Sequence, residues 1–128
     1  MKIFRNPDTE LRPADPQSFV GPVQIKLLAS SDAGASVHVY RVEFGVAGRT
    51  HWHRHSGPQW LFVVAGRIRI QREGDRAEDV EAGDAVVIDP GEKHWHGAAP
   101  GTTGVHLAVN VNATTEWLEP VSDEDYRS

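Results

Sequence analysis

Hydrophobic and polar residues alternate along much of the chain with the two-residue period of β-strands. In residues 36–44 this alternation places four side chains on one face, namely His38, Tyr40, Val42 and Phe44. In residues 67–72 isoleucines alternate with arginines, as in a strand with one buried and one solvated face. Residues 59–65 are apolar nearly throughout, which is typical of a strand covered on both faces.

Turn residues separate the expected strands at a spacing of roughly 8–12 residues. Strands are expected at residues 23–29, 36–44, 50–55, 59–65, 67–72, 77–80, 85–88 and 104–111. Gly66 is expected to close a tight hairpin between two of them. Ser122, followed by three acidic residues, resembles a helix N-cap and predicts one short closing helix. The pattern predicts an all-β sandwich or small barrel.

The N-terminal 22 residues contain four prolines, at positions 7, 13, 16 and 22. Proline interrupts helices, so we expect residues 1–22 to form an extended arm over the domain, held by Phe19 and Val20. Residues 23–128 are expected to form a single domain, because a chain of 128 residues is long enough for one core and too short for two.

Charge and composition exclude several classes of protein. The net charge is −5, with 18 acidic and 13 basic residues in no long runs, so no nucleic-acid partner is expected. The absence of cysteine excludes disulfides, thiolate metal sites and a cysteine nucleophile. No apolar run approaches 18 residues, so we expect no membrane partner and a cytoplasmic protein.

Histidines carry the candidate chemistry. His53 and His55 are two residues apart, so on a strand both project to the same face and can chelate a metal. Gln59 enters on the next strand with an amide oxygen, and His94 completes the set from a distant strand. Three imidazoles in a barrel without a metal would need six other hydrogen-bond partners. A histidine without a second one nearby is usually structural. Each considered alone, three other histidines are interpreted in this way: His38, His51 and His106.

Two stretches resemble the motifs of the cupin family. Residues 48–66, GRTHWHRHSGPQWLFVVAG, are similar to the first cupin motif, and residues 83–94, GDAVVIDPGEKH, to the second. Gln59 stands where the family usually has glutamate, and Asp89 replaces a proline. The chain further resembles the small bacterial cupins that act as manganese-dependent hydroxynitrile lyases, through the segments GRTHWHRHSGPQ, PGEKHWHGAAP, HLAVN and EWLEPVSDEDYR.

The resemblance implies a cupin jelly-roll β-barrel, also called a double-stranded β-helix, around one divalent metal. The implied metal is Mn(II) first and Fe(II) next, with Zn or Ni as alternatives in purified protein. The implied ligands are His53, His55, Gln59 and His94. The implied substrate pocket contains His38, Val42, Leu61, Val63 and Ala108. The implied catalytic residues beside it are His96, Tyr40, His106 and Asn110.

The implied activity is the cleavage or formation of cyanohydrins, such as mandelonitrile from benzaldehyde and cyanide. An uncharged ligand shell leaves the metal its full +2 charge, which favours Lewis-acid chemistry over oxidation. His96 would move the proton, or alternatively only hold the site by a hydrogen bond. Tyr40 would orient a small-molecule substrate or simply pack.

Two other functions remain open, and so does the oligomeric state. An iron-dependent cupin oxygenase is one alternative, although Gln59 counts against it. A non-catalytic metal- and small-ligand-binding cupin, with Tyr40 plugging the pocket, is the other. By strand parity three tryptophans face away from the ligands and belong either to the core between sheets or to a subunit interface: Trp52, Trp60 and Trp95. We therefore expect a homodimer or homotetramer.

Overall fold

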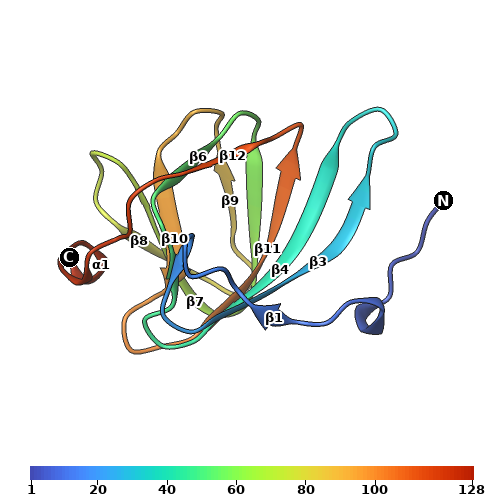
Figure 1. Ribbon diagram of the computed structural model, residues 1–128. Helices are drawn as coiled ribbons and strands as arrows, with labels where there is room; N and C mark the ends of the chain where they lie inside the picture. The colour runs from blue at the N-terminus through green and yellow to red at the C-terminus, as the bar shows by residue number, and fades with distance from the viewer.

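The computed structural model describes residues 1–128 and confirms the all-β jelly roll (Figure 1). A single turn of 3₁₀ helix, η1, spans Asn6–Asp8, and the only α-helix, α1, spans Asp123–Arg127. The strands are β1 (Arg12–Pro13), β2 (Phe19–Val20), β3 (Val23–Ser31), β4 (Val37–Phe44), β5 (Arg49–Thr50), β6 (His53–His55), β7 (Gln59–Arg72), β8 (Glu78–Glu81), β9 (Ala85–Ile88), β10 (His94–Ala98), β11 (Gly104–Val111) and β12 (Thr115–Trp117). No helix is long and apolar enough to cross a membrane.

All strand pairs are antiparallel and form one curled sheet in the order β1-β3-β4-β11-β7-β10-β5-β2. Four strands lie off this path: β8 and β9 pair with β7, β6 pairs with β10, and β12 pairs with β6. The path doubles back on itself, so that β6, β10 and β12 face β4 and β11 across the interior (Figure 1). This arrangement points side chains from strands distant in sequence into one cavity.

The hairpin expected at Gly66 is wrong, because β7 runs unbroken from Gln59 to Arg72. Its first half pairs with β9 and β11, and its second half pairs with β8 and β10. Gly66 adopts a positive φ of 67°, and a Cβ there would collide with the carbonyl oxygen of Thr103. Glycine therefore allows one strand to bend from one half of the barrel to the other.

Two tryptophans lie in the core. Trp52 and Trp95 are buried together with Tyr126 of α1 and Val121. The Tyr126 hydroxyl donates to the Ala98 carbonyl at 2.6 Å, and Trp95 Nε1 donates to the Gln71 side chain at 2.8 Å. The polar groups of Tyr126 and Trp95 therefore both have hydrogen-bond partners. The main core, formed by Val23, Val42, Phe44, Val63, Ile68 and Ala98, fills the barrel below the cavity.

The closing helix begins as predicted. The Ser122 hydroxyl accepts a hydrogen bond from the Asp125 backbone N–H at 3.1 Å, which satisfies one of the free amides of the first turn. Arg49 holds the segment before the helix, because its guanidinium donates twice to the Val121 carbonyl and once to Asp123. These contacts fix the C-terminus against the barrel wall.

The N-terminal residues follow the outside of the barrel. Lys26 of β3 is buried, and its Nζ donates to the backbone carbonyl and the side chain of Asn6 at 2.8 and 2.6 Å. Residues 1–5 project beyond this anchor (Figure 1), with Ile3 and Phe4 exposed.

Residues 59–65 are not covered on both faces. Leu61 and Val63 point inward and are 1% and 3% exposed, whereas their outward neighbours Trp60, Phe62 and Val64 are 42–43% exposed. The inward face is buried by the opposite wall of the barrel. No other segment of this chain packs on the outward face.

Candidate metal centre and pocket

Three imidazoles meet inside the barrel. His53 and His55 lie two apart on β6, and β6 pairs with β10 so that His53 faces His94 directly. The ring centroid of His53 lies 4.2 Å from that of His94 and 4.9 Å from that of His55. The centroids of His55 and His94 are 5.4 Å apart. The pairing of β6 with β10 thus brings His94 beside His53 and His55, although it is distant from them in the sequence.

Each of these rings is oriented by an oxygen atom at Nδ1. The Nδ1–H groups of His53 and His94 donate to the carbonyls of His51 and Glu92, both at 2.8 Å. His55 Nδ1 lies 2.9 Å from the hydroxyl of Thr115 on β12. A proton on Nδ1 leaves the lone pair on Nε2, which is the arrangement that metal-binding histidines use.

Gln59, the first residue of β7, presents its amide oxygen to the cluster. Its Nε2 donates to Asn110 Oδ1 at 2.7 Å, and its Oε1 lies 3.4 Å from His94 Nε2. The amide nitrogen is thus occupied by a neighbour, and the oxygen faces the imidazoles. An amide oxygen is a suitable ligand for a divalent cation of the Mn(II) or Fe(II) type.

His96 is a fourth imidazole at the cluster, with a different neighbour. The nitrogens of His53, His94 and His96 all lie within 4.8 Å of one another. His96 Nδ1, however, lies 2.9 Å from His106 Nε2 rather than from an oxygen atom. His96 Nε2 and His55 Nε2 are both buried and have no hydrogen-bond partner. Geometry alone therefore admits His96 as well as His55 among the ligands.

The donor set fits a divalent metal. Burial lowers the pKa of His94 and of His106 to about 4, and it holds the pKa of His53 and His96 well below the ordinary value. Neutral rings have free lone pairs, and buried nitrogens without partners are costly unless something occupies them. An ion bound at these Nε2 atoms would satisfy them.

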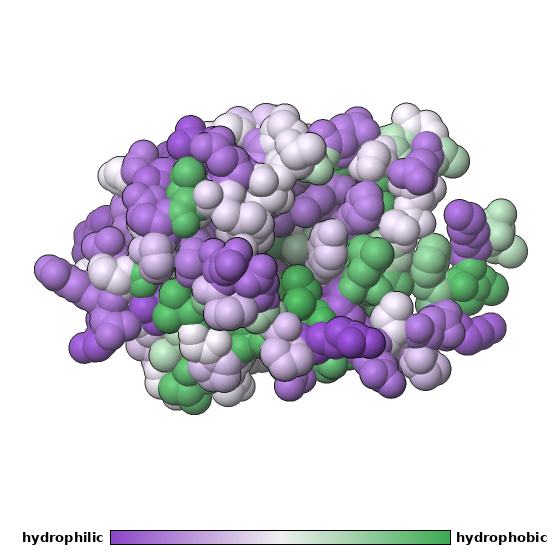
Figure 2. Space-filling model, viewed as in Figure 1, coloured by the Kyte–Doolittle hydropathy of each residue, from purple (hydrophilic) through white to green (hydrophobic).

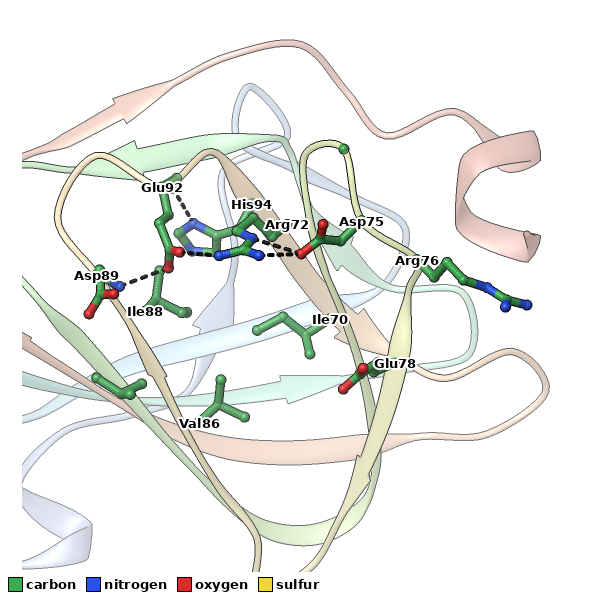
Figure 3. Close-up of a pocket in the computed structure, with 12 residues that line it drawn as sticks. Ile70, Arg72, Asp75, Arg76, Glu78, Val86, Ile88, Asp89, Glu92 and His94 are labelled. Carbon is green, nitrogen blue, oxygen red and sulfur yellow. Dashed lines mark hydrogen bonds and ion pairs between the residues drawn. The ribbon is translucent and has the colours of Figure 1, made fainter.

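A charged network supports His94 from outside the barrel (Figure 3). The Glu92 carboxylate accepts from Arg72 Nη1 and from the Asp89 backbone N–H, both at 2.9 Å, and Arg72 also pairs with Asp75. The network lies on one wall of an open surface cavity of about 660 Å³. It fixes the residue whose carbonyl orients His94.

On the inner side, the cluster opens into a cavity of about 240 Å³. Of the residues implied for catalysis or substrate contact, those that line it are Tyr40, Val42, His96, His106, Ala108 and Asn110. The other three lie outside it. Leu61 and Val63 are buried in two apolar clusters of the barrel core. The ring of His38 stacks on that of Tyr40, with a centroid separation of 6.3 Å.

The sequence analysis missed an aromatic wall of this cavity. Trp117 is 40% exposed, and its ring centroid lies 4.6 Å from that of His53 and 5.4 Å from that of Phe19. Trp117 therefore does not belong to the core, and Phe19 does more than hold the arm. Thr115 and Trp117 are two apart and face the same way, a parity signal that could have revealed this wall.

The family follows from fold, site and sequence together. Residues 40–111 match the family model described as "Cupin domain", and the chain belongs to the cupin family. It is 44% identical over 112 residues to the (R)-mandelonitrile lyase of Granulicella tundricola, an alignment that covers 85% of this chain and 86% of that protein. The resemblance to cupin hydroxynitrile lyases is thus supported.

Solved structures agree with this assignment. A cupin-like protein from Thermotoga maritima superposes with a TM-score of 0.85 and 38% identity over 90% of each chain. The polyketide cyclase RemF from Streptomyces resistomycificus superposes with a TM-score of 0.74 and 22% identity, over 98% of this chain and 90% of that chain. The second similarity is one of fold alone.

Proposed function

We propose that this cupin is a metal-dependent hydroxynitrile lyase that cleaves cyanohydrins such as mandelonitrile to an aldehyde and hydrogen cyanide, or runs the reverse addition. The observation that carries the proposal is the uncharged donor set of imidazoles and one amide, placed directly beside the buried His96–His106 pair. The 44% identity to a mandelonitrile lyase supports it.

The proposed ligands are His53, His55, His94 and Gln59. The three histidines share a feature that His96 lacks, since an oxygen atom orients each ring at Nδ1. A divalent ion held there, Mn(II) first and Fe(II) next, would supply Lewis acidity toward the hydroxyl or nitrile of the substrate. The absence of a ligand carboxylate leaves the ion its full charge.

In the proposed mechanism His96 moves the proton. Its Nε2 lines the cavity without a partner, and its Nδ1–H can donate to His106 Nε2, which fixes the ring. In cleavage the hydroxyl proton of the cyanohydrin passes to His96 Nε2, and the O–H electron pair becomes the carbonyl π bond. The carbon–carbon bond breaks, and its electron pair leaves with cyanide. The same proton then returns to give hydrogen cyanide.

The remaining walls select and orient the substrate. Val42 and Ala108 offer apolar contact for an aryl or alkyl group, and Phe19 and Trp117 offer aromatic faces. His96 and His106 are both buried, and burial strengthens the hydrogen bonds that these side chains make.

A mandelonitrile assay tests this function. Metal-free protein is loaded with Mn(II) or with Fe(II), and benzaldehyde release and oxygen consumption are measured side by side. Benzaldehyde release without oxygen uptake supports the lyase. Oxygen uptake with an organic substrate would instead indicate an iron oxygenase, and neither signal would indicate a binding protein. The double variant His53→Ala/His94→Ala should lose both metal and activity while it remains folded.

A further inference from the structure

The three proposed histidine ligands are held at Nδ1 by two kinds of partner. His53 and His94 lie against backbone carbonyls, which can only accept a hydrogen bond, whereas His55 lies 2.9 Å from the side-chain hydroxyl of Thr115. A hydroxyl group can both accept and donate a hydrogen bond. The contact with His55 therefore engages only one of the two capacities of the Thr115 hydroxyl.

The proposed role of His55 determines the direction of this hydrogen bond. A ligand nitrogen needs its lone pair, so a metal-bound Nε2 places the ring proton on Nδ1, and Nδ1–H then donates to Thr115 Oγ1. The proton of the Thr115 hydroxyl is consequently directed elsewhere. This hydroxyl makes no hydrogen bond within the chain besides the one to His55. Thr115 thus has a free O–H donor, and a metal ligand keeps it free.

Thr115 presents this hydroxyl to the inner cavity. The antiparallel register of β12 and β6 pairs Thr115 with His55 and Trp117 with His53, so both β12 side chains lie on the ligand side. Both line the cavity of about 240 Å³. The face of the molecule that β12 crosses shows hydrophilic residues beside hydrophobic ones (Figure 2). β12 therefore sets one hydrogen-bond donor and one aromatic ring beside the proposed ligands.

The cavity that Thr115 faces is uncharged. No acidic residue, lysine or arginine lines it, so its walls offer the polar atoms of a substrate hydrogen bonds from neutral groups. Thr115 is partly buried. A donor shielded from water and left without an acceptor costs free energy, so such a site disfavours a substrate that lacks an acceptor there. Thr115 is therefore suited to discriminate between substrates of equal size.

The position of Thr115 indicates which part of the substrate it contacts. It contacts Nδ1 of His55 and not Nε2, the proposed ligand atom, so it is separated from the metal and the reacting carbon by the imidazole ring. Trp117 follows two residues later on the same face of β12, roughly 6.8 Å along the strand, and is one of the aromatic walls proposed for the aryl group. The hydroxyl of Thr115 is therefore closer to the aryl end of the substrate than to its cyanohydrin carbon.

We propose that Thr115 is a specificity-determining residue, whose hydroxyl donates a hydrogen bond to an oxygen atom carried by the aryl group of the substrate. The site then prefers aryl cyanohydrins with a methoxy or hydroxyl group on the ring over those with an alkyl group of the same size. The proposal rests on the proposed lyase function for the identity of the substrate. Thr115 contributes binding and orientation and takes no part in proton transfer.

Substrates of equal size test this role. 3-Methoxymandelonitrile and 3-ethylmandelonitrile differ in whether the substituent contains an acceptor oxygen, and the 4-substituted pair repeats the comparison at the next ring position. For the manganese-loaded full chain, kcat/KM should be about fivefold higher for the methoxy substrate at one or both positions, the usual contribution of one neutral hydrogen bond. Thr115→Val should reduce this ratio to about one, and Thr115→Ser should keep it. Any loss of metal from a variant cancels in the ratio, because both substrates meet the same preparation.

Thr114→Val is the matched control. Thr114 is exposed, and its hydroxyl lies 3.2 Å from that of Ser56, so this variant makes the same chemical change one residue away and should keep the wild-type ratio. A wild-type ratio of about one at both ring positions would overturn the proposal. A preference for the methoxy substrate that persists in Thr115→Val would overturn it as well.

Binding of the product aldehydes separates this proposal from the proposed lyase function. Calorimetry gives the Kd values of the methoxy- and ethylbenzaldehydes on the same manganese-loaded proteins without turnover. If no cyanohydrin is cleaved, the lyase function is wrong, yet a fivefold preference for a methoxy aldehyde that Thr115→Val abolishes would support the hydroxyl as a donor to the ligand. If cyanohydrins are cleaved and neither kcat/KM nor Kd distinguishes the substituents, the lyase function stands and the role of Thr115 is wrong.

Discussion

The Nε2 of Gln59 donates to Asn110 Oδ1 at 2.7 Å, and this contact determines which end of the amide faces the histidines. With its nitrogen occupied, Gln59 presents oxygen to His94 Nε2 at 3.4 Å. Asn110 is the direct partner of Gln59 on the neighbouring strand β11, so a neutral residue fixes which atom a proposed ligand presents to the metal.

The first prediction concerns Asn110. Asn110→Leu removes the acceptor and allows the Gln59 amide to rotate, so Mn(II) affinity should fall by about tenfold. Asn110→Asp keeps an acceptor oxygen and should lose less. Titration of metal-free protein with Mn(II) against a competing chelator measures both. Wild-type affinity in Asn110→Leu would contradict the role given to this hydrogen bond.

The second prediction separates His55 from His96. His55→Ala should lose bound metal, because its Nε2 is a proposed ligand atom. His96→Ala should keep metal and lose at least about 100-fold in the rate of mandelonitrile cleavage, the usual contribution of a general acid–base group. Metal analysis and steady-state kinetics on the same preparations test this. If His96→Ala lost metal and His55→Ala kept it, His96 would be the ligand and His55 the candidate for proton transfer.

The third prediction concerns the support behind His94. Glu92→Ala removes the acceptor of Arg72 and of the Asp89 N–H and loosens the backbone that orients His94. Metal affinity should fall by about tenfold. Glu73→Ala is the control, because it removes a carboxylate from a different ion pair, that with Lys93, and leaves the contacts of Glu92 in place. Equal affinities in the two variants would show that the network does not position His94.

The fourth prediction concerns Tyr40, which lines the 240 Å³ cavity. Tyr40→Ala should raise kcat/KM for bulky aryl cyanohydrins by about tenfold, because the extra space accommodates a larger group, and should leave metal content unchanged. Tyr40→Phe keeps the bulk and should behave as wild type. A fall in both variants on all substrates would instead assign a role to the phenol hydroxyl.

The fifth prediction is a pH dependence of stability. The hydrogen bond from buried Arg49 lowers the pKa of Asp123 below its usual 3.8. A carboxyl group with a lowered pKa in the folded state stabilises the fold above its unfolded pKa, and that contribution is lost as pH falls through the folded value. Asp123→Asn should therefore unfold at lower urea concentration than wild type at pH 7. The difference should shrink below pH 3.8, and a gap independent of pH would contradict it.

Most of the barrel could be predicted from sequence, because each strand has one face toward a shared interior and its alternation records that face. His53, His55 and His94 could be grouped for the same reason. Gly66 could not be understood locally, since whether a glycine turns or bends a strand depends on which strands pair on either side. Trp117 could not be assigned to the pocket wall from the sequence, because an aromatic side chain suits a core as well as a pocket, and only the pairing of β12 with β6 sets its ring beside His53.

The unbroken course of β7 has a consequence for turnover. Because this strand belongs to both halves of the barrel and begins with Gln59, the halves cannot separate without pulling on a proposed ligand. Substrate and product are therefore not expected to exchange by opening of the barrel between its two halves. Phe19 and Trp117 line the cavity, and Trp117 is 40% exposed, so we expect substrate and product to exchange by rotation of these two rings within a rigid barrel.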